Sequence, residues 1–236
     1  FTPLALLGSG THGSVFLVSS PTSQRYALKV VNKAHAKKRR VSGAQLLREQ
    51  AAMHKARDAR GIVRMHASWH DKKHYFFLLE AYPNGDLYER VYAARLPSAS
   101  VQFYAAQLLL ALDHLHALHI VHHDLKLENI FLDAHGNVVL GDFGLCEFLD
   151  PVPHARCATH PSGRQSGTLP YFSPEIVKQM AVAYDVDRWA FGVVVYELLM
   201  SKLPFTDACE QDVVTRIIHA KPKFDASVHP EAKDFV

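Results

Sequence analysis

The stretch from His122 to Gly144 contains the side chains with the clearest chemical potential. It reads His-His-Asp-Leu-Lys-Leu-Glu-Asn, then an apolar, strand-like segment, then Gly-Asp-Phe-Gly. Asp124 could accept a hydroxyl proton, and Lys126 could neutralise a phosphoryl oxygen. Asn129 and Asp142 could hold a divalent metal ion, and their 13-residue separation suits a hairpin that brings both to one site. Positioning, a metal ion and charge neutralisation are what phosphoryl transfer requires.

A glycine-rich segment near the start of the chain could bind phosphate. Gly8, Gly10 and Gly13 form a GxGxxG pattern, which alone is weak because dinucleotide-binding folds use the same spacing. A dinucleotide site needs a helix after the glycines, but residues 15–18 are β-branched and apolar, and Pro21 follows. We therefore expect a strand–loop–strand hairpin, and a Rossmann-type oxidoreductase is disfavoured.

Lys29 lies in the apolar strand-like run Tyr-Ala-Leu-Lys-Val-Val. A lysine there often extends its amine past the edge of the strand into solvent. Glu49 offers an alternative partner, because it is the only acidic residue between Lys29 and Asp58. It falls within a predicted helix over residues 42–57.

Taken in order, these motifs resemble those of eukaryotic protein kinases of the serine/threonine type. The sequence is most like the cyclic-nucleotide-dependent (AGC) or calmodulin-dependent groups. The resemblance implies an α+β, bilobal fold: a small antiparallel β-sheet lobe with one helix over residues 1–81, and a larger, mainly helical lobe over residues 82–236. The patterns predict further strands and helices over residues 62–69, 74–80, 98–119, 187–200 and 210–220.

The resemblance also implies a nucleotide pocket. Backbone groups near Glu80 and Tyr82 would meet the adenine, Leu79 would stand beside the pocket, Phe131 would lie beneath the ring, and Val15 and Ala27 would close it from above. Asp86 is expected to cap the next helix or to bind a ribose or a basic substrate. Glu128 stands where these groups bind an arginine upstream of the phosphoacceptor.

The implied cofactors are ATP and Mg²⁺ (or Mn²⁺), and the implied partner is a protein with a serine or threonine acceptor. In the implied mechanism Lys29, held by Glu49, contacts the α- and β-phosphates, while Asn129 and Asp142 bind the metal. Asp124 accepts the hydroxyl proton and Lys126 steadies the γ-phosphate. Thr168 would contact Asp124 and Lys126, and Asp187 would support the loop that carries them. The alternative is a kinase-fold scaffold with weak or no catalysis, which binds nucleotide and partners.

One position departs from the family pattern, because His123 stands where an arginine usually clamps a phosphorylated loop residue. Histidine cannot form the bidentate fork of arginine, so we expect activity without loop phosphorylation. The alternative is that this change marks weakened catalysis. The Pro- and Gly-containing segment 145–166 would be that loop. Its His154, Cys157 and His160 have metal-ligand-like spacing, but we expect no zinc site.

Composition excludes several classes of protein. A net charge of +3 is too small to indicate nucleic-acid binding, and no apolar run reaches the ~20 residues of a membrane span. The three cysteines form no CxxC pair, and the first residues lack a charged segment of the signal-peptide kind. We therefore expect an intracellular, cytoplasmic protein, which can also enter the nucleus.

The resemblance further implies helices beyond Val236, one with an arginine for Glu175, and regulatory regions or subunits outside this stretch.

Overall fold

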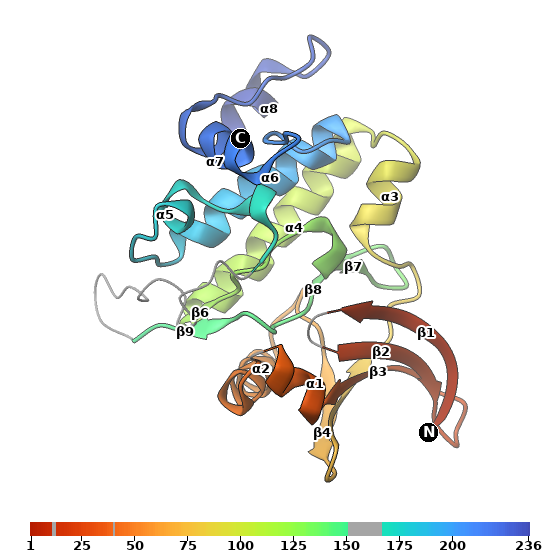
Figure 1. Ribbon diagram of the computed structural model, residues 1–236. Helices are drawn as coiled ribbons and strands as arrows, with labels where there is room; N and C mark the ends of the chain where they lie inside the picture. The colour runs from red at the N-terminus through yellow and green to blue at the C-terminus, as the bar shows by residue number, and fades with distance from the viewer. Residues whose placement is uncertain (11–12, 40, 151–166) are drawn as a thin grey trace.

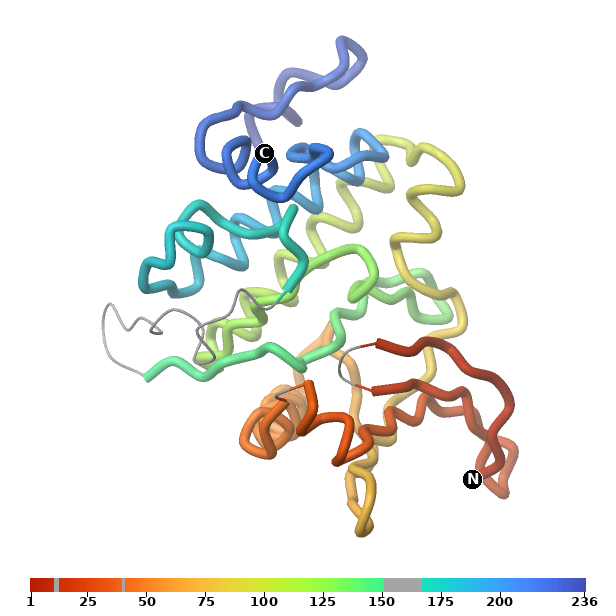
Figure 2. Tube along the Cα trace, in the orientation of Figure 1, coloured from red at the N-terminus to blue at the C-terminus, as the bar shows by residue number. Residues whose placement is uncertain are grey.

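The computed structural model describes residues 1–10, 13–39, 41–150 and 167–236. Figure 1 shows a twisted β-sheet with two helices at the bottom and a group of helices above it. The chain between residues 120 and 150 runs between these two parts, as the green trace in Figure 2 shows. The expected bilobal α+β architecture is confirmed.

The sheet contains five antiparallel strands in the order β1-β2-β3-β5-β4. Glycines at the tip of the β1–β2 hairpin are directly opposed, with Gly10 paired to Gly13. Gly13 has a φ of 132°, a conformation that L side chains rarely adopt. The expected strand–loop–strand hairpin is therefore confirmed. The strands are β1 (Thr2–Gly10), β2 (Gly13–Ser19), β3 (Arg25–Asn32), β4 (Met65–His70) and β5 (His74–Glu80).

The predicted strand over residues 62–69 is displaced in the structure. Ile62 forms a parallel bridge with Leu140 instead of joining the sheet, and the Val63 amide donates to Leu140 O at 2.9 Å. Strand β4 therefore begins only at Met65. The apolar pattern could not distinguish these two partners, because either one buries Ile62 and Val63.

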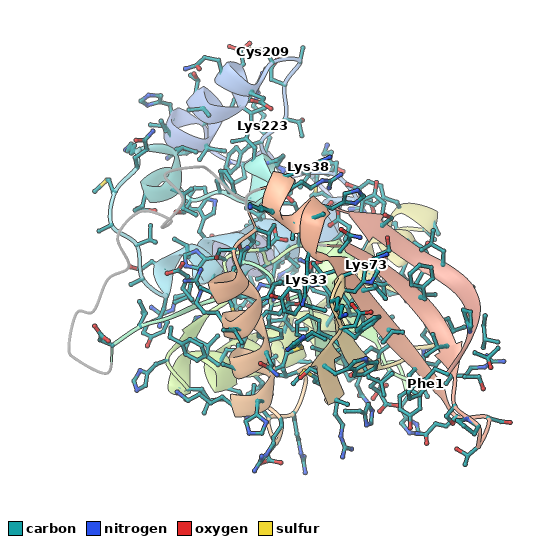
Figure 3. The ribbon with its side chains drawn as sticks, turned by 60° about the horizontal axis from the view of Figure 1, so that its bottom comes forward. Phe1, Lys33, Lys38, Lys73, Cys209 and Lys223 are labelled. Atoms are coloured by element: carbon teal, nitrogen blue, oxygen red, sulfur yellow. The ribbon has the colours of Figure 1, made fainter. Side chains whose placement is uncertain are left out.

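Two helices, rather than the expected one, pack beside the sheet. The basic run after β3 forms the short helix α1 (Lys33–Lys38), which Asn32 caps and which buries only Ala36. Its first amide donates to Lys73 O at 2.8 Å, so Lys33 and Lys73 lie close together in Figure 3, with Lys38 further along the helix. Helix α2 (Gly43–Lys55) is capped by Ser42 and buries Leu46, Glu49, Ala52 and Met53. Ser42 thus begins the helix as predicted.

The helical lobe is organised around α4 (Ser98–Ala117) and α6 (Asp185–Met200). On α4, the residues at i, i+4 and i+7 from Leu108 are buried, as the predicted pattern requires. Leu109 is 39% exposed, because one residue turns the helix by 100° and takes this side chain off the buried face. The other helices are α3 (Leu87–Ala93), α5 (Pro174–Val177), α7 (Glu210–His219) and α8 (Pro230–Phe235).

The connection between the lobes contains two small sheets and little other regular structure. Strand β6 (Ile120–Val121) pairs with β9 (Glu147–Phe148), and β7 (Ile130–Leu132) pairs with β8 (Val138–Leu140). Two short 3₁₀ turns flank them, at Leu127–Asn129 and Leu169–Tyr171. One core cluster joins both lobes, since it includes Phe77 of the sheet, Met53 of α2 and Leu112 of α4.

No helix of the described residues is long and apolar enough to cross a membrane. Cys146 is buried and Cys209 is exposed, and both are free thiols. The segment with His154, Cys157 and His160 lies outside the described residues, as do the loop positions that a phosphate would occupy.

Candidate functional site

Lys29 is held between two carboxylates, one from helix α2 and one from the segment after β8. Its Nζ lies 2.5 Å from Glu49 Oε1 and 3.0 Å from Asp142 Oδ1. The side chains of Lys29 and Glu49 are 8% and 2% exposed. Burial opposes the positive charge, but Asp142 and Glu49 outweigh it, so that the pKa of Lys29 is raised. The sequence-based pairing of Lys29 with Glu49 is present, and the amine is held as a cation.

One buried carboxylate holds the loop after β6 in place through backbone hydrogen bonds. Asp187, in the first turn of α6, accepts hydrogen bonds from His122 N at 2.8 Å and His123 N at 2.9 Å. His116 Nε2 of α4 lies 2.9 Å from Asp187 Oδ2. Burial raises the pKa of Asp187, but the His116 hydrogen bond and the neighbouring His122 and His123 outweigh it, so the pKa is lowered. The carboxylate therefore stays charged and fixes the backbone ahead of Asp124.

Replacing Asp187 with asparagine should reduce the free energy of unfolding by about 3 kcal/mol, because it removes a buried charge from its partners. The lowered pKa means that this stabilisation is fully present above the ordinary aspartate pKa and is lost as pH falls through the lower, folded-state value. The difference between wild type and variant should therefore be constant at neutral pH and shrink in acid. Urea unfolding at pH 7 and in acid measures it.

Asp185→Asn is the matched control for that comparison. Asp185 lies in the same helical turn, but its side chain is 67% exposed and pairs with Arg188. Such a pair contributes about 0–1 kcal/mol. If both variants unfolded alike, Asp187 would not have the role described here.

The two carboxylate oxygens of Asp124 differ in their hydrogen bonding. Oδ2 accepts from Lys126 Nζ at 2.9 Å and from Asn129 Nδ2 at 3.0 Å. Oδ1 is buried and has no hydrogen-bond partner within the described residues. A buried acceptor without a partner costs free energy, so this oxygen is well suited to receive a hydroxyl group from outside.

Thr168 lies on the same side of the site. Its Oγ1 accepts from Lys126 Nζ at 3.0 Å, so the expected contact with Lys126 is present. The backbone turns sharply just before it, where Gly167 has a φ of 126° and a Cβ would meet the Phe172 ring at 2.8 Å. Segment 167–172 is thereby held against Asp124.

The β7–β8 hairpin brings Asn129 and Asp142 to the same end, as the 13-residue interval predicts. Ile130 is paired with Leu140, and the next backbone contact is Gly141 N donating to Asn129 O at 2.9 Å. Asn129 uses its NH₂ group on Asp124, so its side-chain oxygen is the atom suited to a metal ion. Asp142 adopts a φ of 55°, which turns its carboxylate toward Lys29.

This donor set fits magnesium or manganese. Magnesium is commonly bound by one or two carboxylates together with substrate phosphates rather than by a complete protein cage. The described residues contain no group of three or more histidine, cysteine, aspartate or glutamate side chains that could hold a metal by themselves. The Asp142 carboxylate and the Asn129 amide oxygen therefore suit a metal ion whose remaining ligands come from substrate phosphates.

The sheet and the β7–β8 hairpin supply the residues expected to line an apolar slot. Ala27 pairs with Leu79, and Val15 pairs with Lys29. Phe131 stacks on Tyr82, with ring centroids 6.0 Å apart and an interplanar angle of 15°. Gly141 permits this packing, since a Cβ there would meet the Phe131 ring at 2.8 Å. Such slots suit a planar purine.

The stretch after β5 allows only part of the expected adenine contact. Glu80 N already donates to Arg64 O at 2.9 Å, so its carbonyl is the group suited to adenine. The Tyr82 hydroxyl accepts from Arg64 N at 3.2 Å. Burial raises the pKa of Tyr82 to about 12. Asp86 caps α3 through Glu89 N at 2.9 Å, the first of its two expected roles, and Glu128 is exposed.

One buried acid, in helix α6, was not predicted from the sequence. Glu197 of α6 is 1% exposed and accepts from the Tyr92 hydroxyl at 2.7 Å and from the Tyr171 hydroxyl at 2.5 Å. Burial raises the pKa of Glu197. A single acid in the apolar run 190–200 was the available signal, but its tyrosine partners are 26 and 105 residues away.

Comparison with known proteins gives a consistent picture. Residues 1–236 match the family described as protein kinase domain. cAMP-dependent protein kinase type 3 of Saccharomyces cerevisiae is 32% identical over 238 residues, which cover 100% of this chain and 57% of that protein. Ribosomal protein S6 kinase alpha-3 of Homo sapiens is 34% identical over 247 residues, covering 100% of this chain and 31% of the relative. The chain thus spans less than two thirds of the length of these relatives.

Proposed function

The chain belongs to the protein kinase family, and we propose from this premise that it transfers the γ-phosphate of Mg-ATP to a serine or threonine hydroxyl of a protein. The relatives' names support a serine/threonine kinase of the cyclic-nucleotide-dependent (AGC) group. The observation that carries the proposal is the buried Asp124 Oδ1, which has no hydrogen-bond partner within the described residues. The other oxygen of this carboxylate, Oδ2, accepts from Lys126, which also donates to Thr168.

Each polar side chain then has a defined task. Asp124 Oδ1 orients the acceptor hydroxyl and takes its proton, while Lys126 steadies the transferring phosphoryl group. Lys29, kept charged by Glu49 and Asp142, binds the α- and β-phosphates. Asn129 and Asp142 would hold magnesium or manganese, which supplies charge neutralisation on the phosphates.

The adenine is proposed to lie in the apolar slot. Ala27 and Val15 cover one face of the ring, Phe131 covers the other, and Leu79 stands at the side. The Glu80 carbonyl and the backbone near Tyr82 meet the polar edge of the base. Gly8, Gly10 and Gly13 belong to the hairpin whose backbone amides would fold over the phosphates.

We further propose a preference for basic substrates. Glu128 is exposed and lies two residues after Lys126 in the sequence, and Asp86 is half-buried and forms a backbone bridge with Phe131. Glu128→Gln should reduce kcat/KM for a peptide with an upstream arginine by about tenfold, since a charge-assisted hydrogen bond contributes about 1.5 kcal/mol. The same variant should leave kcat/KM for a peptide without the arginine unchanged. Equal effects on both peptides would show that Glu128 does not select for arginine.

Transfer of labelled γ-phosphate from Mg-ATP to a mixed serine/threonine peptide pool tests the proposed function directly. Transfer that chelation of the metal abolishes would support it. Nucleotide binding without transfer, in this chain and in a version extended past Val236, would instead favour a nucleotide-binding scaffold. Regulatory regions or subunits outside this stretch are part of the proposal, because the relatives are longer than the chain.

A further inference from the structure

One face of α2 contacts the segment that follows Asp142. Gln45, Arg48 and Glu49 are spaced i, i+3 and i+4, so they share this face. Gln45 Nε2 donates to Gly144 O at 2.6 Å, and Arg48 Nη2 lies 3.7 Å from Glu147 Oε1. Glu49 holds Lys29. Helix α2 thus carries both the residue that orients Lys29 and two residues that contact segment 144–147.

Glu147 also helps to support the catalytic loop, the segment after β6 that carries Asp124. It is a residue of β9 and is paired with Val121 of β6, immediately before His122. Leu149 N donates to His119 O at 2.9 Å, which extends this contact by one residue pair. A displacement of Glu147 would therefore also displace the backbone that leads into Asp124.

The two charges are partly withdrawn from water and face each other between α2 and β9. The side chain of Glu147 is 12% exposed and that of Arg48 is 34% exposed. A carboxylate withdrawn from water to this degree requires a compensating cation, and Arg48 supplies one from α2. The Arg48 carbonyl also accepts from Cys146 Sγ at 3.9 Å, so the backbone and the side chain of Arg48 contact two consecutive residues, Cys146 and Glu147.

We propose that Glu147 is a positioning residue that, paired with Arg48, holds α2 on β9 and so keeps Lys29, Asp142 and Asp124 aligned without a phosphate on the loop. The inference rests on the proposed function, and it explains how a chain with His123 could dispense with an arginine clamp. A carboxylate of the chain itself forms the electrostatic link between the lobes. Gln45 supplies a second, uncharged link through Gly144.

Charge variants separate this role from a contribution to stability alone. Glu147→Gln and Arg48→Gln should each lower kcat about fivefold, the population shift that a partly buried ion pair can produce. KM for ATP should change less than kcat. The reversed pair, Arg48→Glu with Glu147→Arg, should recover most of the loss. Asp58→Asn is the control, because its side chain is 91% exposed and pairs with Arg57 just past the end of α2.

Amide hydrogen exchange provides a readout that does not require transfer. Exchange in segments 43–55 and 142–149 should accelerate in both single variants and return toward the wild-type rate in the reversed pair. Unchanged exchange in these segments would overturn the proposal, whatever happens to kcat. Faster exchange with unchanged kcat would reduce the ion pair to a stabilising contact and also overturn it. If the wild-type chain transfers no phosphate, the proposed function fails, and the link between α2 and β9 is decided by exchange alone.

Discussion

Asp124→Ala is expected to lower kcat about 10³-fold, within the range that a positioned general base contributes. The variant removes Oδ1, the buried oxygen proposed to accept the substrate proton. It also removes Oδ2 from Lys126 and Asn129. Binding of ATP should be nearly unaffected, because Asp124 is proposed to contact the acceptor hydroxyl and not the nucleotide.

Single-turnover transfer from labelled ATP, with the ATP dissociation constant measured in parallel, checks this expectation. Lys126→Ala is the informative companion, because it leaves the carboxylate in place and removes the charge beside the phosphoryl group. A smaller loss is expected from it. An Asp124→Ala variant with wild-type kcat would exclude Asp124 as the base and leave the proposed mechanism without its central step.

Lys29→Met is expected to reduce transfer about 10²-fold and also to destabilise the protein. The functional loss follows from removing a preorganised cation from the proposed phosphate site. The structural loss follows because Glu49, 2% exposed, keeps its charge after the lysine cation has been removed. Breaking a buried pair in this way costs about 3 kcal/mol. Lys72→Met, on the exposed turn between β4 and β5, should change neither property.

A second substitution separates the two effects of Lys29→Met. The double variant Lys29→Met with Glu49→Gln also removes the buried negative charge, so its free energy of unfolding should return to within about 1 kcal/mol of wild type. Its transfer rate should stay low, since no cation is restored. If activity returned together with stability, Lys29 would have a structural role only. Urea unfolding and initial rates of transfer on the same preparations decide between these outcomes.

The sequence could predict the parts of the site that depend on short, ordered motifs. The hairpin at Gly8–Gly13, the pairing of Lys29 with Glu49 and the convergence of Asn129 with Asp142 all follow from local pattern and spacing. The catalytic and binding roles of these residues stay predictions, as do the boundary after residue 81 and the effect of His123.

The parts that escaped prediction depend on distant partners. Ile62 had two equivalent ways to be buried, and only the position of Leu140 decides between them. Glu197 is satisfied by two tyrosine hydroxyls from separate segments, and the contact of Gln45 with Gly144 spans 99 residues. Such contacts carry no periodicity and no local composition, because they form only when elements far apart in the sequence are packed together.

The support of the catalytic loop by Asp187 has a consequence for synthesis of the protein. The two backbone hydrogen bonds that Asp187 accepts from the loop span 64 and 65 residues, and its contact with His116 spans 71. During translation, the loop therefore leaves the ribosome well before the carboxylate that orders it. Since contacts of long sequence separation form late in folding, the loop of a nascent chain, and with it the proposed transfer activity, would stay unformed until α6 had been made and had docked.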